Sequence, residues 1–323
     1  MKKWGICKAT AILIVLIVSQ KAEAQELRVL RTTQLPDYPS ASTLEFHKNR
    51  LYVIGDDAPH MMVLDSNHKV LDKVRLFPGK ERRIAKSTKP DLETSILLRQ
   101  GAVDYLVGIP SFSAKDRNKV VVINLSDNRI VSSDLTFFNT RMKELQLQDQ
   151  NIEGSAWVNN KLLLGSRANG KHKHNHLILS DFSIGEGIRF ENARLIRLQL
   201  PRTEELVGIS GFVYVPEKDL LLFTASTEAA PDAYADGRIG DSYLGYIENI
   251  SRKLGRRRIK ADYMMNLTEA LQVKEPVKME AVAVQTINKD GLTVHLAADN
   301  DNGKSTLYKV EWQPRSNLRA ATP

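Results

Sequence analysis

Short apolar runs separated by polar turns recur along the chain, and their spacing is typical of β-strands. The runs are bounded by Gly, Asn, Asp and Lys, which commonly occupy tight turns between strands. Helical periodicity is almost absent, and only 141–147 and 266–273 have the pattern of short helices. The sequence therefore predicts an all-β protein.

A longer repeat is superimposed on these runs. In each copy a small or acidic residue opens an apolar strand, and a turn leads to a second apolar strand that ends in polar residues. The five copies lie at 42–57, 93–111, 153–167, 210–228 and 280–301. Further apolar runs between the copies, such as 61–65 and 119–125, would complete units of four strands. Four antiparallel strands per unit predict a single β-propeller.

The five copies predict five blades over residues 25–313. A sixth blade remains an alternative, because 70 residues separate the openings of the last two copies, Ser210 and Glu280. The run 27–35 precedes the first copy and has a strand pattern. We expect it to pair with 307–312 and close the ring, since such pairing removes an exposed sheet edge. Residues 314–323 are predicted to form a flexible C-terminal tail.

Residues 1–24 have the features of a secretory signal peptide. A basic start precedes the apolar run 11–19, and Ala22-Glu23-Ala24 has the small-x-small pattern of a cleavage site. The run is too short for the roughly 20 apolar residues of a spanning helix. No later segment is long and apolar enough to span. We therefore expect an exported protein, periplasmic or extracellular, with no transmembrane segment after cleavage.

Composition and charge narrow the chemistry of the mature chain. The 323 residues are 42% hydrophobic and 26% charged, which is typical of a soluble globular protein. The single cysteine, Cys7, lies in the predicted signal, so no disulfide or cysteine nucleophile is expected afterwards. Loss of four lysines and one glutamate with the signal lowers the formal charge from +8 to +5. This modest charge argues against nucleic acid as a partner.

Several familiar catalytic signatures are missing from the sequence. It contains no GxSxG elbow, no HExxH, no Walker loop and no GxGxxG after a strand. Serine hydrolase, zincin and nucleotide-binding functions therefore have little support, and we expect no organic cofactor.

The repeat itself predicts where a site should lie. In a propeller, the innermost strand of each blade starts at one end of the axial channel, and the antiparallel second strand ends there. The residues that open the first strands are Ser42, Glu93, Glu153, Ser210 and Glu280. The residues that close the second strands include Asp56, Asp57, Ser111, Ser166, Arg167, Thr227, Glu228, Asp299, Asn300 and Asp301. The sequence therefore predicts an acidic mouth.

Three glutamates at equivalent positions of a ring would repel one another if they were buried without partners. One interpretation is a divalent cation such as Ca²⁺. Its candidate ligands are Glu93, Glu153, Glu280, Asp56, Asp299 and Asp301. A second interpretation is neutralisation by Arg167, Lys89 and Lys278, and a third is hydrogen bonding of each glutamate to backbone N–H groups of the neighbouring blade.

Histidines near the predicted mouth are further candidates. His60 lies close to Asp56 and Asp57 in sequence, as a general base would. The loop 168–176 contains His172, His174 and His176, whose alternation would place three imidazoles on one side of an extended segment. Imidazole suits zinc, copper or nickel. A solvated basic loop explains the same residues.

Two polar segments complete the set of candidates. The loop 229–245 follows Glu228 and is either a lid or ion-binding loop or simply exposed to solvent. Its charged residues include Asp232, Asp236, Arg238 and Asp241. The basic run 252–260 is predicted to be a hairpin tip in water, and binding of an anionic polymer is the alternative.

Nearly the whole mature chain resembles secreted bacterial propellers. The similar motifs are a glutamate or serine followed by a small residue and an apolar strand, and acidic ends of second strands. They occur here at 151–155, 208–212, 278–282, 55–57 and 298–301. The chain thus resembles the esterase-like phytase and SdiA-regulated families, or a related propeller family of unknown function.

The phytase resemblance implies a small polar or phosphorylated ligand at an acidic axial site, with metal-assisted phosphoester hydrolysis as the activity. The implied catalytic residues are Glu93, Glu153, Glu280 and Arg167. The implied ligand-binding residues are Lys89, Lys278, His60, Ser42 and Ser210. The two serines depart from an acidic ring and would weaken a metal site. The alternative function is a non-catalytic interaction propeller of the cell envelope.

Overall fold

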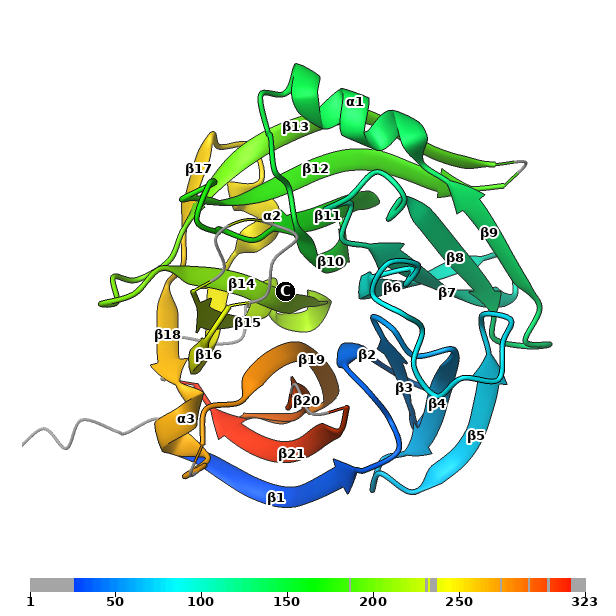
Figure 1. Ribbon diagram of the computed structural model, residues 1–323. Coiled ribbons are helices and arrows are strands. Elements are labelled where there is room, and N and C mark those ends of the chain that lie inside the picture. The colour runs from blue at the N-terminus through cyan, green and yellow to red at the C-terminus, as the bar shows by residue number, and fades with distance from the viewer. Residues whose placement is uncertain are drawn as a thin grey trace, which may run out of the picture.

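The computed structural model describes residues 26–314 except for 186, 230–231, 233–236, 274, 290 and 301–302. Within this part, five sheets are arranged radially around a central axis (Figure 1). Each innermost strand contacts the innermost strands of its two neighbours, which closes the ring. The predicted five-bladed propeller is therefore confirmed, and the described residues contain no sixth sheet. The predicted signal peptide and residues 315–323 lie outside the described residues.

The first two blades are simple four-stranded meanders. Blade 1 consists of β2 (Ala41–His47), β3 (Arg50–Gly55), β4 (His60–Asp65) and β5 (Val70–Arg75). Blade 2 consists of β6 (Leu92–Gln100), β7 (Val103–Pro110), β8 (Lys119–Asn124) and β9 (Ile130–Asp134). After β9 the chain forms α1 (Thr136–Glu144), which begins five residues before the predicted helix at 141–147.

Blade 3 has a fifth strand that comes from a distant part of the chain. Its first four strands are β10 (Ile152–Val158), β11 (Lys161–Ser166), β12 (Asn175–Ile184) and β13 (Ile188–Gln199). The fifth, β17 (Arg258–Lys260), runs parallel to β13, with Ile259 opposite Leu198. Ile259 is buried, whereas Arg258 and Lys260 are exposed. The prediction of a hairpin tip at 252–260 was therefore wrong: this basic run is the end of α2 (Ile250–Lys253), a turn and an edge strand.

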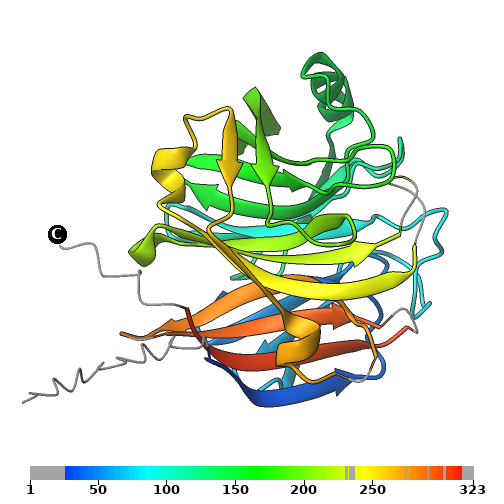
Figure 2. The ribbon, with the colours of Figure 1, turned by 90° about the vertical axis from the view of Figure 1, so that its left-hand side faces the viewer.

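Blades 4 and 5 complete the ring (Figures 1 and 2). Blade 4 consists of β14 (Val207–Val215), β15 (Leu220–Glu228), β16 (Ile239–Glu248) and β18 (Tyr263–Asn266), with the short 3₁₀ helix η1 (Pro216–Lys218) between β14 and β15. The helix predicted at 266–273 is the single turn α3 (Leu267–Ala270). Blade 5 consists of β19 (Lys278–Ile287), β20 (Leu292–Asp299), β21 (Ser305–Gln313) and β1 (Glu26–Leu35).

The N-terminal strand closes the propeller as expected. β1 pairs antiparallel with β21, with Leu27 opposite Trp312 and Leu35 opposite Ser305. The outer strand of blade 5 therefore comes from the start of the described chain and the three inner strands from its end. The faces of neighbouring blades pack into apolar clusters that fill the space between the sheets. These clusters hold the innermost strands in position around the axis.

Candidate functional site

All five innermost strands have a β-bulge at the same place. Where each inner strand pairs with the second strand of its blade, the register shifts by one residue, as between Ala41 and Thr43 or between Leu92 and Thr94. The skipped residues are Ser42, Glu93, Glu153, Ser210 and Glu280. A bulge bends the strand and redirects a side chain. The residue that opens each repeat in the sequence is thus the bulged residue of its blade.

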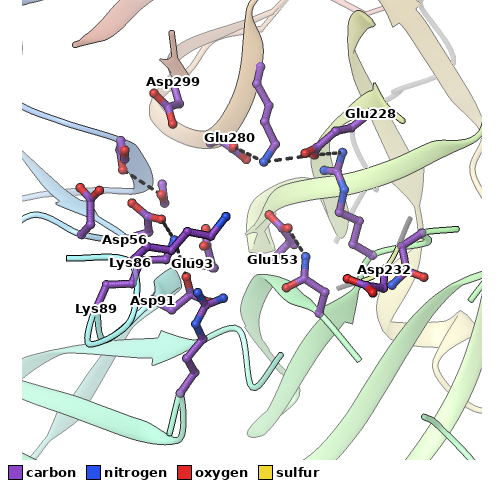
Figure 3. Close-up of a pocket in the computed structure, with 18 of the residues that line it drawn as sticks. Asp56, Lys86, Lys89, Asp91, Glu93, Glu153, Glu228, Asp232, Glu280 and Asp299 are labelled. Carbon is purple, nitrogen blue, oxygen red and sulfur yellow. Dashed lines mark hydrogen bonds and ion pairs between the residues drawn. The ribbon is translucent and has the colours of Figure 1, made fainter. Parts of the chain in front are cut away.

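Four of the five bulged residues line one cavity of about 140 Å³ at one mouth of the channel. Figure 3 shows Glu93, Glu153 and Glu280 facing this cavity from three different blades. The predicted convergence is found in part. Five of the predicted second-strand ends line the cavity, namely Asp56, Asp57, Arg167, Glu228 and Asp299, whereas Ser111, Ser166, Thr227 and Asn300 do not. The full lining is Ser40, Ser42, Asp56, Asp57, Arg83, Lys86, Lys89, Asp91, Glu93, Arg117, Asn151, Glu153, Arg167, Asn169, Glu228, Asp232, Lys278, Glu280 and Asp299. We call it the axial cavity.

The axial cavity contains nine carboxylate and six basic side chains, so its lining is acidic in excess. The charges form two groups (Figure 3). In the first, the Lys89 ammonium contacts the carboxylates of Asp56 and Asp91, with 2.6 Å between Lys89 Nζ and Asp91 Oδ1. Arg117 Nη1 lies 2.8 Å from Asp91 Oδ2. Burial alone would lower the pKa of Lys89, but Asp56, Asp91 and Glu93 raise it above its ordinary value.

The second group joins blades 3, 4 and 5. Lys278 Nζ lies 2.9 Å from Glu280 Oε1 and 3.3 Å from Glu228 Oε2. Arg167 Nη2 lies 3.2 Å from the same Glu228 oxygen and also donates to Ser226 Oγ at 3.0 Å. Both cations are mostly buried, and the adjacent carboxylates keep their pKa values above the ordinary values despite desolvation. Arg167 and Lys278 are therefore held as charged groups.

Two of the bulged glutamates each have a carboxylate oxygen without a hydrogen-bond donor among the described residues. Glu153 Oε1 accepts a hydrogen bond of 2.6 Å from Asn151 Nδ2, whereas its Oε2 has no partner among the described residues. Glu280 Oε2 is likewise buried without a partner in that part of the chain. Burial raises the pKa of Glu153 to about 8 and that of Glu280 to about 7, although Arg167 and Lys278 oppose the rise. Burial and the charge of Asp91 also raise the pKa of Glu93.

Of the three interpretations of the glutamate ring, the described geometry favours neutralisation by basic side chains. Lys89, Lys278 and Arg167 are the cations that the sequence indicated. Lys89 and Lys278 each pair with carboxylates of two blades, and Arg167 of blade 3 pairs with Glu228 of blade 4. The hydrogen bonds found for Glu153 and Glu280 come from side chains, so the backbone N–H interpretation was wrong for these two.

A pattern in the repeat that sequence reasoning missed contributes further side chains. The residue two positions before the bulge also lines the cavity in four blades: Ser40, Asp91, Asn151 and Lys278. Asn151 bonds to Glu153, and Lys278 bonds to Glu280, so the pair i, i+2 works as a unit. Its signal was visible as a polar residue two positions before four of the five repeat openings, the exception being Gly208 before Ser210. Arg83, Lys86, Arg117 and Asn169 come from loops and had no such signal.

The rim of the cavity is joined by backbone hydrogen bonds between blades. Asp91 N donates to Asp56 O at 3.0 Å, Ser111 N donates to Asp91 O at 2.9 Å, and Ile152 N donates to Ser111 O at 2.9 Å. This series of hydrogen bonds connects the end of the second strand of one blade to the start of the first strand of the next blade. These hydrogen bonds between blades consequently restrain the backbone that carries the charged side chains.

Two of the predicted ligand-binding residues do not line the cavity. His60 lies at the start of β4, where its ring packs edge-on against Tyr38 at 5.3 Å, so it is not a base for the axial site. Burial lowers its pKa, as do the charges of Lys73 and Arg75. Ser210 is fully buried, and its hydroxyl donates to Met279 O of blade 5. Its place in the repeat serves the contact between blades. Asp301 lies outside the described residues.

The histidine loop does not gather three imidazoles at one point. His172 Nε2 lies 3.0 Å from His176 Nδ1, whereas His174 Nδ1 faces Arg197 at 3.0 Å. Within the described residues, the one cluster of three potential metal-ligating side chains is Asp56, Asp91 and Glu93.

The long loop after β15 has separate anchors. Asp232 lines the axial cavity and pairs with Lys171 at 2.9 Å. Arg238 pairs with Glu205 at 3.5 Å. Asp241 accepts a hydrogen bond of 3.4 Å at its backbone oxygen from Thr227 Oγ1. Asp236 lies outside the described residues, so a lid stays a prediction.

Comparison with protein families decides the classification. The family described as "Family of unknown function (DUF6929)" matches residues 37–312. The chain belongs to this family. Membership of DUF6929 confirms the third alternative of the resemblance, a propeller family of unknown function. It does not support membership of the phytase family. No curated protein matches the sequence.

Several solved structures are similar to this DUF6929 protein at low sequence identity. Glutaminyl cyclase from Myxococcus xanthus is 10% identical, with a TM-score of 0.50 over 90% of this chain and 97% of that one. A putative exported protein from Bacteroides fragilis is 9% identical, with a TM-score of 0.41 over 90% and 95%. The PQQ-bound aldose sugar dehydrogenase from Streptomyces coelicolor is 12% identical, with a TM-score of 0.42 over 90% and 98%. At this identity, the likeness to the glutaminyl cyclase shows the fold alone.

The described part of the DUF6929 chain has no helix with the length and hydropathy needed to cross a membrane. This agrees with the sequence-based expectation for residues 26–314.

Proposed function

We propose that this DUF6929 protein is an exported propeller that binds a small polar ligand in the axial cavity. The ligand supplies hydrogen-bond donors or a positive charge. The observation that carries the proposal is the pair of partnerless acceptors, Glu153 Oε2 and Glu280 Oε2, buried beside a polar cavity of about 140 Å³. A buried acceptor left without a donor costs about 1–3 kcal/mol, which a ligand hydroxyl or ammonium recovers on binding.

The pairing of the deep cations supports the same ligand class. Arg167 and Lys278 share Glu228, and Lys89 is held by Asp56 and Asp91. A phosphorylated ligand would have to compete with these carboxylates for every deep positive charge. A ligand that donates hydrogen bonds needs no such exchange.

The glutamates also give the site a means of proton transfer. Carboxyl groups with pKa values of about 7 and 8 change protonation near neutral pH, as general acids and bases do. Lys278 beside Glu280 supplies a fixed positive charge. The site is thus equipped to bind a ligand and to move a proton on it.

Calcium fits this site less well. A Ca²⁺ ion takes six to eight oxygen ligands, and Asp56, Asp91 and Glu93 bring three oxygens within 4.8 Å of one another. The ammonium of Lys89 already contacts two of these carboxylates. An ion would have to displace it. Metal-assisted phosphoester hydrolysis, which the phytase resemblance implies, therefore has weaker support than direct binding of a polar ligand.

The test is calorimetric titration of the purified protein with a panel of polyols, amino acids, sugar phosphates and CaCl₂. We expect a polyol or amino-bearing compound to bind, and Glu153→Gln/Glu280→Gln to weaken it about tenfold or more. The control is Glu191→Gln, an exposed glutamate of β13. Mass spectrometry of the recovered ligand separates binding from turnover. Binding of sugar phosphates only in the presence of Ca²⁺ would contradict the proposal and support the hydrolase.

A further inference from the structure

A second and larger cavity lies in the fold, away from the axial cavity. It has a volume of about 770 Å³ and shares no lining residue with the axial cavity. All five innermost strands contribute to it, through residues farther along each strand than the bulge. Its walls therefore surround the opposite mouth of the channel. We call it the distal cavity.

The walls of the distal cavity are largely apolar and aromatic. Phe46, Trp157 and Tyr214 come from three different blades, and each is only partly buried. Aliphatic side chains such as Leu97 and Ile287 lie between them. A cavity of this size and composition is typical of pockets for small organic ligands.

The charge in the distal cavity has one sign. Its lining contains two carboxylates, Glu45 on β2 and Glu217 on η1, and no Lys, Arg or His among the described residues. Within that part of the chain, Glu45 forms no ion pair, and no charged group shifts its pKa. Burial raises the pKa of Glu45 to about 8, against a hydrogen bond with the Ser95 side chain. The fold thus holds a partly buried carboxyl group, with no ion pair among the described residues, in a cavity that three aromatic side chains also line.

We propose that the distal cavity binds an organic ammonium ion that carries an apolar group, with Glu45 as its counter-ion. An ammonium group over aromatic faces gains cation–π attraction in addition to its ion pair, and the apolar group buries against the aliphatic wall. A metal ion fits poorly. The lining offers two carboxylates on different elements, and the Tyr214 hydroxyl is already bonded to Asp219 at 3.1 Å. This site is separate from the proposed function of the axial cavity.

Phenethylammonium is a suitable probe, and 2-phenylethanol is its neutral counterpart. We expect the ammonium to bind the mature protein, residues 25–323, and to change the emission of Trp157. The alcohol and the Glu45→Gln variant are each expected to show about tenfold weaker binding. Trp157→Phe keeps an aromatic wall and should remove most of the optical signal while calorimetric binding persists.

Controls assign the binding to one cavity. Glu153→Gln/Glu280→Gln should bind the ammonium as the wild type does, and Glu191→Gln serves as the surface control. Equal affinity for the ammonium and the alcohol, or unchanged affinity in Glu45→Gln, would overturn the proposal. So would absence of binding at millimolar concentration, or loss of binding in the axial variant.

Discussion

At the scale of single residues, the axial cavity depends on carboxylates that burial makes hard to ionise. Glu153 and Glu280 have pKa values of about 8 and 7 although Arg167 and Lys278 are close. Desolvation therefore outweighs attraction for these carboxyls, whereas attraction prevails for the two cations. The cavity can accordingly take up or release protons near neutral pH without changing the protonation of its basic groups.

This leads to a prediction about stability and pH. A carboxyl whose pKa rises from 4.5 when unfolded to about 8 when folded binds more protons in the folded state. The free energy of unfolding should therefore fall as the pH rises through that window. Glu153→Gln removes the titrating group and keeps an acceptor for Asn151, so its stability should fall less between pH 5 and about 8. Urea unfolding at several pH values measures both curves, with Glu191→Gln as control. Parallel curves for wild type and Glu153→Gln would contradict the assignment.

At the scale of secondary-structure elements, the bulge is the device that turns a strand into part of a site. Each inner strand continues its ladder on both sides of the bulged residue, so the strand keeps its hydrogen bonds while that residue is skipped. After the bulge in blade 3 comes Gly154, where a Cβ would lie 2.4 Å from Phe212 Cδ1. Glycine is needed there because the Phe212 ring of β14 packs directly on the β10 backbone.

Gly154→Ala should therefore disrupt the packing between blades 3 and 4. We expect a loss of about 1–3 kcal/mol in the free energy of unfolding, as for other overpacked interiors. The matched control is Gly187→Ala, because no atom lies within 4 Å of a Cβ added there. Chemical denaturation of both variants measures the difference. An equal effect of the two substitutions would refute the packing explanation.

At the scale of the whole molecule, two blades contain a strand that comes from a distant part of the sequence. β1 supplies the outer strand of blade 5, and β17 leaves blade 4 to pair with β13 of blade 3. Both connections join segments that lie far apart in the sequence. A closed ring keeps the innermost strands, and thus both channel mouths, at fixed distances from one another.

Deletion of residues 26–35 should consequently destabilise the whole propeller. Trp312 of β21 is fully buried and faces Leu27 across the closing pair, so its emission should shift to longer wavelength. The free edge of β21 should also promote aggregation. Thermal unfolding and light scattering measure both effects. Deletion of residues 315–323, which make up all but the first residue of the predicted tail, is the control and should leave stability unchanged. A deletion of β1 that unfolds like the wild type would refute closure.

The sequence alone was sufficient for the architecture, because a repeated alternation of apolar strands and polar turns has few solutions other than a propeller. The same repeat located Glu93, Glu153 and Glu280 together with Lys89, Lys278 and Arg167, since equivalent positions of a closed ring meet on its axis.

Only the tertiary structure decided which charges pair and which acceptors are left over. Arg117 pairs with Asp91 from a loop, His60 packs against Tyr38, and β17 pairs with blade 3 although the strands before and after it belong to blade 4. These contacts depend on loop paths and on packing between sheets, which local sequence patterns do not encode. The distal cavity has the same origin, because its walls come from five strands far apart in the chain.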